Sequence, residues 1–202
     1  MMKEKDLNAR IRKFWKWFES ISDDLFENVT RRDLLDQIDT HVSLLGKLDW
    51  EIGPVDKSNY YFAISPNLDD KKLEFTMEIV SSAPICRGWK FFSSKPPKEW
   101  EGKWEMKNEK NEDIFVDTTD WEYVLYQFED NTFAMDILID GVDGDLNTHR
   151  LAVDIALTGY LGEEKFMTLI RDIQFITELK NEQINRLTKL RHILKHIDSI
   201  SS

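Results

Sequence analysis

Two stretches of the chain repeat one order of predicted elements, which is strand, strand, helix, strand. The first stretch opens on Asp49-Trp50 and the second opens on Asp120-Trp121. We therefore predict an internal duplication of one ββαβ unit. If the two copies pair side by side, they form a central, mostly antiparallel sheet with helices packed on it, which is an α+β fold.

The repeats divide the chain into five consecutive segments. With 202 residues the chain is long enough to bury a core, and we expect a single domain. The segments are the N-terminal helices (1–46), the first repeat (48–95), a charged connector (96–119), the second repeat (120–179) and a C-terminal helix (181–200).

Composition excludes several classes of protein. Hydrophobic residues make up 41% and aromatic residues 12% of the chain, too much for a disordered protein. The first residues have no apolar run of signal-peptide length, and no stretch approaches the roughly 20 apolar residues of a membrane span. The only cysteine is Cys86, which fits a reducing compartment. We therefore predict a cytoplasmic protein without a membrane partner.

The net charge of −11, from 38 acidic and 27 basic residues, limits the choice of partners. At neutral pH it repels phosphate backbones and anionic lipids, so nucleic acid is a poor partner. The charge either attracts a basic protein or serves solubility alone.

The N-terminal segment shows helical periodicity. Apolar residues recur every three or four positions between Leu7 and Phe26, and a second stripe runs from Leu34 to Leu45, with Thr30 as a candidate N-cap. An aromatic cluster within the first helix is typical of a core. Trp17 lies off the main stripe, so it is the member that we expect at the surface and in contact with a partner.

Turn residues bound the elements of both repeats. In the first repeat they predict strands at 48–55, 60–65 and 88–95, with a helix that begins at Asp69 or Asp70. In the second they predict strands at 121–128, 132–139 and 172–177, with a helix capped by Asn147 or Thr148. The apolar stripe from Ile184 to Ile197 predicts one further helix, which packs on the body or on a second copy of the chain.

The connector is dense in charge, yet it contains Trp100 and Trp104. Burial of a tryptophan removes a large apolar surface from water, so these side chains are expected to be anchored against the body or against a partner. We predict Trp100, Trp104 and Trp17 as candidate binding residues.

The sequence patterns that could indicate a metal site are weak. Asp143, Asp145 and Asn147 alternate like the first ligands of a calcium loop, but Thr148 stands where that loop needs glycine. A turn with a helix cap explains these residues better. The pair His192 and His196 has metal-ligand spacing without a third ligand, so a solvated helix face is the better interpretation.

Catalytic motifs are lacking as well. A reactive thiol at Cys86 needs a base, and nothing in the sequence ties it to His41 or His149. There is no GxSxG elbow, Walker lysine loop or GxGxxG motif. We therefore predict no metal, no cofactor and no catalytic residues.

The run from Ala83-Pro84 through Gly88-Trp89 to Lys95-Pro96-Pro97, with the later Leu161-Gly162-Glu163, resembles a family of soluble bacterial α+β proteins without an established activity. The resemblance covers about residues 48–179. It implies an α+β fold and a cytoplasmic bacterial protein, and it implies no activity.

Three hypotheses follow. The first is a non-enzymatic protein-binding module, such as an immunity-type protein that binds and neutralises a basic partner. The alternative is a small-molecule-binding protein or enzyme, with a site between the sheet and the N-terminal helices. The third is a homo-oligomer formed through the C-terminal helix.

Overall fold

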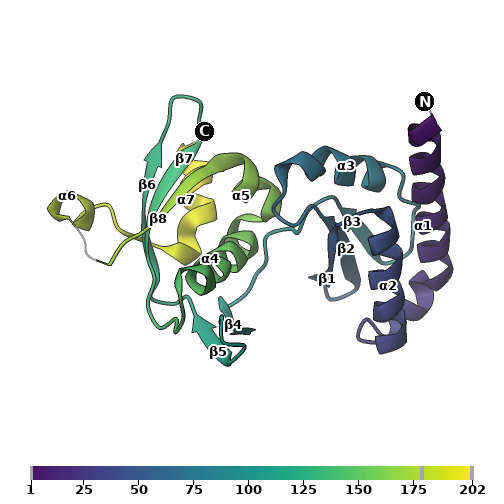
Figure 1. Cartoon of the computed structure of the whole chain (residues 1–202), viewed down its shortest axis with the longest axis horizontal. Coiled ribbons are helices and arrows are strands. Elements are labelled where there is room, and N and C mark those ends of the chain that lie inside the picture. The colour runs from purple at the N-terminus through teal and green to yellow at the C-terminus, as the bar shows by residue number, and fades with distance from the viewer. Residues whose placement is uncertain (1, 178–179, 201–202) are drawn as a thin grey trace. The chain divides into compact units, whose positions relative to one another are not determined.

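A computed structural model of the chain describes residues 2–177 and 180–200 and confirms an α+β fold. Figure 1 shows its helices and strands, coloured along the chain from purple at the N-terminus to yellow at the C-terminus. The chain divides into two compact units, an N-terminal unit (Met1–Lys95) and a C-terminal unit (Pro96–Ser202). Each unit has its own hydrophobic core, so the two are described separately.

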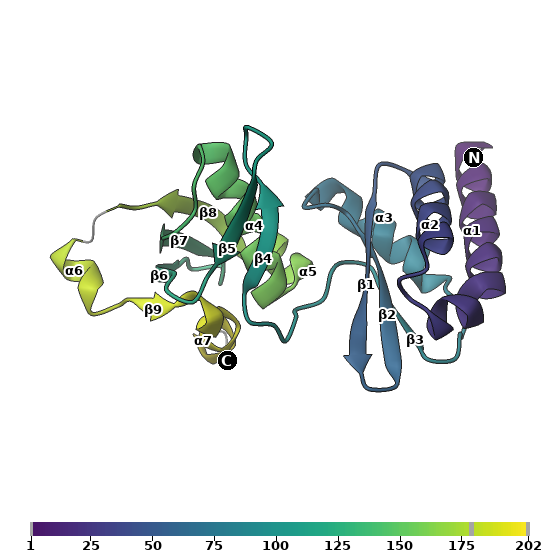
Figure 2. The ribbon, with the colours of Figure 1, turned by 90° about the horizontal axis from the view of Figure 1, so that it is seen from below.

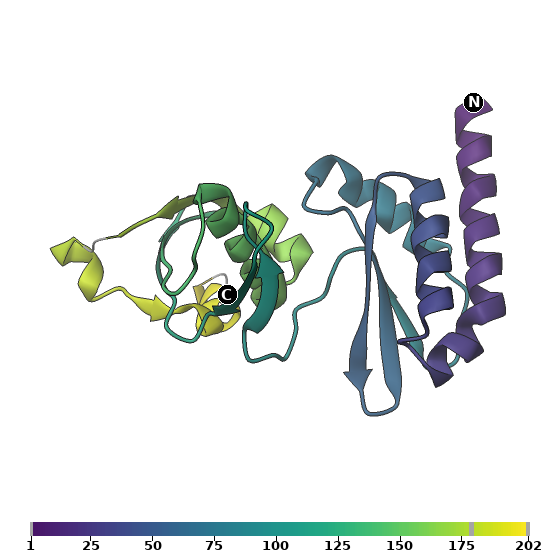
Figure 3. The ribbon, with the colours of Figure 1, turned by 60° about the horizontal axis from the view of Figure 1, so that its bottom comes forward.

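The N-terminal unit begins with two helices and continues with the first predicted repeat. Its elements are α1 (Met2–Glu27), α2 (Arg32–Leu45), β1 (Asp49–Asp56), β2 (Asn59–Ser65), α3 (Asp70–Ser81) and β3 (Trp89–Phe92). Strand β2 lies at the centre of a three-stranded sheet, antiparallel to β1 and parallel to β3. Figures 2 and 3 show α1 and α2 on the same side of this sheet.

The core of the N-terminal unit is aromatic. The ring of Phe18 on α1 is fully buried, and its centroid lies 4.9 Å from that of Phe62, 5.5 Å from that of Trp89 and 5.4 Å from that of Phe91. The indole of Trp15 donates a hydrogen bond to the carbonyl of Ile79 on α3 (2.7 Å). The periodic stripe of α1 therefore packs onto the sheet, as the sequence predicted.

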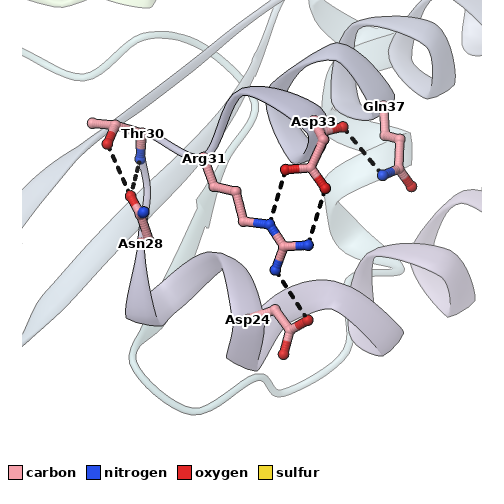
Figure 4. Close-up of polar contacts among 6 residues, drawn as sticks. All are labelled: Asp24, Asn28, Thr30, Arg31, Asp33 and Gln37. Carbon is pink, nitrogen blue, oxygen red and sulfur yellow. Dashed lines mark hydrogen bonds and ion pairs between the residues drawn. The ribbon is translucent and has the colours of Figure 1, made fainter.

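Arg31 joins the end of α1 to the start of α2 (Figure 4). Its guanidinium donates two hydrogen bonds to the carboxylate of Asp33 (2.9 and 3.0 Å) and one to Asp24 (3.5 Å). The predicted cap at Thr30 is wrong, because the N-cap position is Arg31, and Thr30 donates its N–H and hydroxyl to Asn28 Oδ1 instead.

The C-terminal unit contains more elements than its sequence pattern predicted. They are β4 (Lys103–Lys107), β5 (Asp113–Asp117), β6 (Glu122–Gln127), β7 (Phe133–Leu138), α4 (Leu146–Leu161), α5 (Glu163–Leu169), β8 (Ile170–Phe175), α6 (Asn181–Ile184), β9 (Thr188–Lys189), the 3₁₀ helix η1 (Leu190–His192) and α7 (Ile193–Ile200). Its four-stranded sheet has the order β8-β7-β6-β9, and β4 and β5 form a separate hairpin.

The buried core of the C-terminal unit joins its sheet, its helices and the hairpin. Alternate residues of β6 and β7, such as Tyr123 and Met135, belong to one buried cluster with Leu157 of α4 and Ile193 of α7. Val116 of β5 is also fully buried in this cluster. The hairpin is thus part of the packed unit.

Both units contain the same arrangement of strands. In each, a β-hairpin is followed by a helical segment and by a strand parallel to the second hairpin strand, which gives β1-β2-β3 and β6-β7-β8. The duplication itself stays a prediction. The copies do not share one sheet, however, because the strands of the described residues form three sheets and each ββαβ unit has its own.

Three local expectations for the C-terminal unit are corrected. The connector contains the β4–β5 hairpin, and the N-cap of α4 is Asp145 rather than Asn147 or Thr148. The predicted C-terminal helix is interrupted, because β9 pairs with β6 and separates α6 from α7. No helix within the described ranges has both the length and the apolar character that crossing a membrane requires.

Candidate functional site

The start of the connector is tied to α4. The backbone N–H of Lys98 donates to the carbonyl of Gly159 (2.7 Å), and a Cβ on Gly159 would lie 2.2 Å from Cζ2 of Trp100. Further along, Gly102 adopts φ +70° where a side chain would meet the hydroxyls of Tyr160 and Thr118. Glycine at these two positions therefore leaves the space that this segment needs to lie close against α4.

The two connector tryptophans pack on each other. The rings of Trp100 and Trp104 are stacked at a centroid distance of 5.3 Å, and Trp104 meets the buried Trp121 edge-on at 6.4 Å. Their buried indole N–H groups have no acceptor in the part of the chain that the structure describes. Both side chains are half-buried, so a large share of each ring already packs within the unit.

Trp100 also lines a surface pocket of about 310 Å³. The connector, the end of β5, α4 and η1 together supply its lining, which consists of Trp100, Glu101, Lys103, Thr119, Tyr160 and Arg191. These residues are far apart in the sequence, and no local motif announces the pocket.

A chain of hydroxyl groups borders the pocket. Thr118 donates its hydroxyl proton to the carbonyl of Gly102 (3.0 Å), and the hydroxyl of Tyr160 lies 2.7 Å from that of Thr118. Because Thr118 has a single hydroxyl proton, Tyr160 is the donor in this second bond. The oxygen of Tyr160 therefore keeps acceptor capacity beside the pocket.

The charged residues that line the pocket differ in whether they form an ion pair. Lys103 forms an ion pair with Asp117 (3.1 Å). Hydrogen bonds from Thr119 and this contact with Lys103 lower the pKa of Asp117 to about 2. Within residues 2–177 and 180–200, neither Glu101 nor Arg191 forms an ion pair, and Arg191 Nε lies 3.4 Å from Nε2 of His192.

Trp17, the third predicted binding residue, belongs to the N-terminal unit. It is half-buried on α1 and stacks on His41 of α2, with ring centroids 3.8 Å apart and an interplanar angle of 11°. Burial, and to a smaller extent Lys13, lowers the pKa of His41. The expectation that Trp17 contacts a partner stays a prediction.

The negative charge of the chain is concentrated in the C-terminal unit. The N-terminal unit has 15 basic and 16 acidic residues, whereas the C-terminal unit has 12 basic and 22 acidic residues. Between Glu99 and Asp145 the chain carries 15 acidic residues against 3 basic ones. Of these acids 12 are exposed and 3 are half-buried, so this charge faces solvent.

Of the residues that resembled a calcium loop, Asp145 is the N-cap of α4. Asp145 accepts a hydrogen bond from the backbone N–H of Thr148 (2.9 Å), Asn147 donates to Asp145 (3.2 Å), and Asp154 pairs with Arg150 (3.1 Å). Glu109 at the tip of the hairpin accepts from the Thr148 hydroxyl (2.9 Å). Among the described residues, no group of three or more His, Cys, Asp or Glu side chains is arranged to hold a metal ion.

The remaining nucleophile and histidine candidates have structural environments. Cys86 is buried, and burial raises the pKa of its thiol. His192 is exposed as predicted, but His196 is half-buried and its Nδ1 lies 2.8 Å from the hydroxyl of the buried Tyr123. The prediction of a solvated face is therefore wrong for His196.

A site between the sheet and the N-terminal helices has little room. The aromatic side chains of α1 and the sheet fill this layer, with ring centroids of Trp15 and Phe91 4.8 Å apart and those of Phe14 and Phe62 6.3 Å apart. The packing gives no support to a ligand at that place.

No protein-family model, curated protein or solved structure matches the chain. The resemblance in the segment from Ala83 to Pro97 therefore stays a prediction, and candidate functions rest on the chain's own residues.

Proposed function

We propose that the chain is a non-enzymatic, cytoplasmic protein-binding module whose C-terminal unit binds a basic protein. The observation that carries the proposal is the excess of 15 acidic over 3 basic residues between Glu99 and Asp145. These acids lie on the hairpin, on β6 and β7 and in the turns around them, none of them buried. Complementary charge on a partner would accelerate association and favour this surface over others.

The uneven distribution of charge supports binding over a general role in solubility. A charge that served solubility alone would be expected on both units, yet the N-terminal unit is nearly neutral, with 15 basic and 16 acidic residues. An immunity-type protein that neutralises a basic toxin is one partner relationship that fits this charge pattern.

Affinity capture from the native host tests the proposal with two charge-matched variants. The first combines Glu105→Gln, Glu112→Gln and Asp143→Asn. All three acids are exposed, and none forms an ion pair with a described residue. The control combines Glu27→Gln, Glu74→Gln and Glu78→Gln, which removes the same charge from exposed positions of the N-terminal unit.

We expect the wild type and the control to capture the same basic protein in stoichiometric amount. The first variant should capture clearly less of it, because three favourable charges are gone. Equal capture by both variants would contradict the assignment to the C-terminal unit. Recovery of no stoichiometric basic partner by the wild type would contradict the function.

Self-association through the C-terminal segment is a second candidate. Leu190, Ile193 and Ile197 pack in the core of their own unit, whereas Ile184 is 52% exposed. Light scattering of the wild type and of Ile184→Asp tests this candidate. An assembly that the substitution dissociates would support it, and a monomer at all concentrations would contradict it.

A further inference from the structure

The pocket lined by Trp100 and Tyr160 presents two opposite charges that do not neutralise each other. Glu101 and Arg191 both line it, yet in the described chain they form no ion pair with one another or with a third residue. Two opposite charges that share a pocket without meeting leave room for a ligand that carries both complementary charges.

The third charged residue of the lining adds no net charge. Lys103 is compensated by Asp117 at 3.1 Å, and Asp117 is held in its charged form by hydrogen bonds from Thr119. The charges available to a ligand are therefore the carboxylate of Glu101 and the guanidinium of Arg191. A guanidinium favours a carboxylate, because its planar N–H groups match the two oxygens.

The rest of the lining sets the size and character of the ligand. A volume of about 310 Å³ is at the lower end of small-molecule sites, which suits a compound with few heavy atoms. The rings of Trp100 and Tyr160 offer apolar surface, and the Tyr160 oxygen can accept a further hydrogen bond because its proton is donated to Thr118.

We propose that this pocket binds a free α-amino acid, with its carboxylate on Arg191, its ammonium group on Glu101 and its side chain against Trp100 and Tyr160. The apolar rings favour an amino acid with an aromatic side chain. This inference does not rest on the proposed protein partner, since the pocket uses only Glu101 of the 15 acids between Glu99 and Asp145.

Calorimetric titration of the full chain with L-phenylalanine tests the proposal. Two analogues of the same ring act as probes: 2-phenylethylamine lacks the carboxylate and 3-phenylpropionate lacks the ammonium group. We expect L-phenylalanine to bind and each analogue to bind about threefold to tenfold more weakly, the loss of one charged contact. No binding of L-phenylalanine, or equal binding of either analogue, would overturn the proposal.

Two pairs of variants locate the site. Glu101→Gln and Arg191→Gln should each weaken L-phenylalanine about threefold to tenfold, whereas the neighbouring exposed residues in Glu99→Gln and Lys195→Gln should leave its affinity unchanged. Glu101→Gln should leave 3-phenylpropionate unaffected, because that probe has no ammonium group. Loss of affinity in the control variants as large as in the pocket variants would contradict the assignment.

Discussion

The backbone of Gly159 is in direct contact with the indole of Trp100, because a Cβ at position 159 would lie 2.2 Å from Cζ2 of that ring. In an exposed helix, Gly→Ala stabilises by about 1 kcal/mol. Here we expect Gly159→Ala to destabilise the C-terminal unit by about 1–3 kcal/mol, since the ring must move. Urea unfolding measures the change.

A double variant separates this clash from a general effect on α4. In the Trp100→Leu background the added methyl group has space, so Gly159→Ala should cost clearly less than in the wild type. If alanine at position 159 changes the free energy of unfolding equally in both backgrounds, the close contact does not determine the need for glycine.

Two tryptophans of the C-terminal unit differ in their hydrogen bonds. Trp121 Nε1 donates to the carbonyl of Asp140 (3.0 Å), whereas the buried N–H of Trp104 has no acceptor among described residues. We expect Trp121→Phe to cost about 1–2 kcal/mol more than Trp104→Phe, because only the first leaves a carbonyl without its donor. Equal costs in denaturant unfolding would show that the indole hydrogen bond contributes nothing.

The contact between Trp17 and His41 should respond to pH. Burial lowers the pKa of His41 below its ordinary value of 6.5, so the folded state favours the neutral ring. This contribution to stability is present above about pH 6.5 and is lost as the pH falls toward the lower folded pKa, because the unfolded chain takes up the proton first. His41→Gln should remove this part of the pH dependence, and an unchanged profile would contradict it.

Asp117 should titrate far below an ordinary aspartate. Its pKa of about 2 has hydrogen bonds from Thr119 as the largest cause, and Lys103 contributes less. The stability it adds is present above about pH 3.8 and is lost as the pH falls through about 2. In NMR titrations, Thr119→Ala should raise this pKa more than Lys103→Met; the reverse order would contradict the assignment of causes.

Much of the fold follows from local periodicity. The apolar stripes of α1 and α2 lie where the sequence placed them, and α3 begins at Asp70, one of the two predicted starts, with Asp69 as its N-cap. These signals succeed because each depends on residues within a few positions of one another.

The elements that the sequence did not predict depend on contacts between residues far apart in the chain. The C-terminal stripe fits a helix, but Gln183 hydrogen-bonds Asp136 (2.7 Å) and Thr188 pairs with Tyr123, which interrupts it. The β4 strand did leave a signal, since polar residues alternate with Trp104 and Met106. The pocket left no signal in the sequence, because Trp100 and Arg191 are far apart in the chain and line one pocket only after folding.

The most direct test of the proposed function is the ionic-strength dependence of association with the captured basic partner. Surface charges steer association strongly in low salt and weakly in high salt. The association rate of the wild type should fall steeply as salt rises. The triple variant at Glu105, Glu112 and Asp143 should show a shallower dependence, and the variant at Glu27, Glu74 and Glu78 should keep the wild-type slope. A rate that does not depend on salt, or one slope shared by all three proteins, would contradict binding through the acidic C-terminal unit.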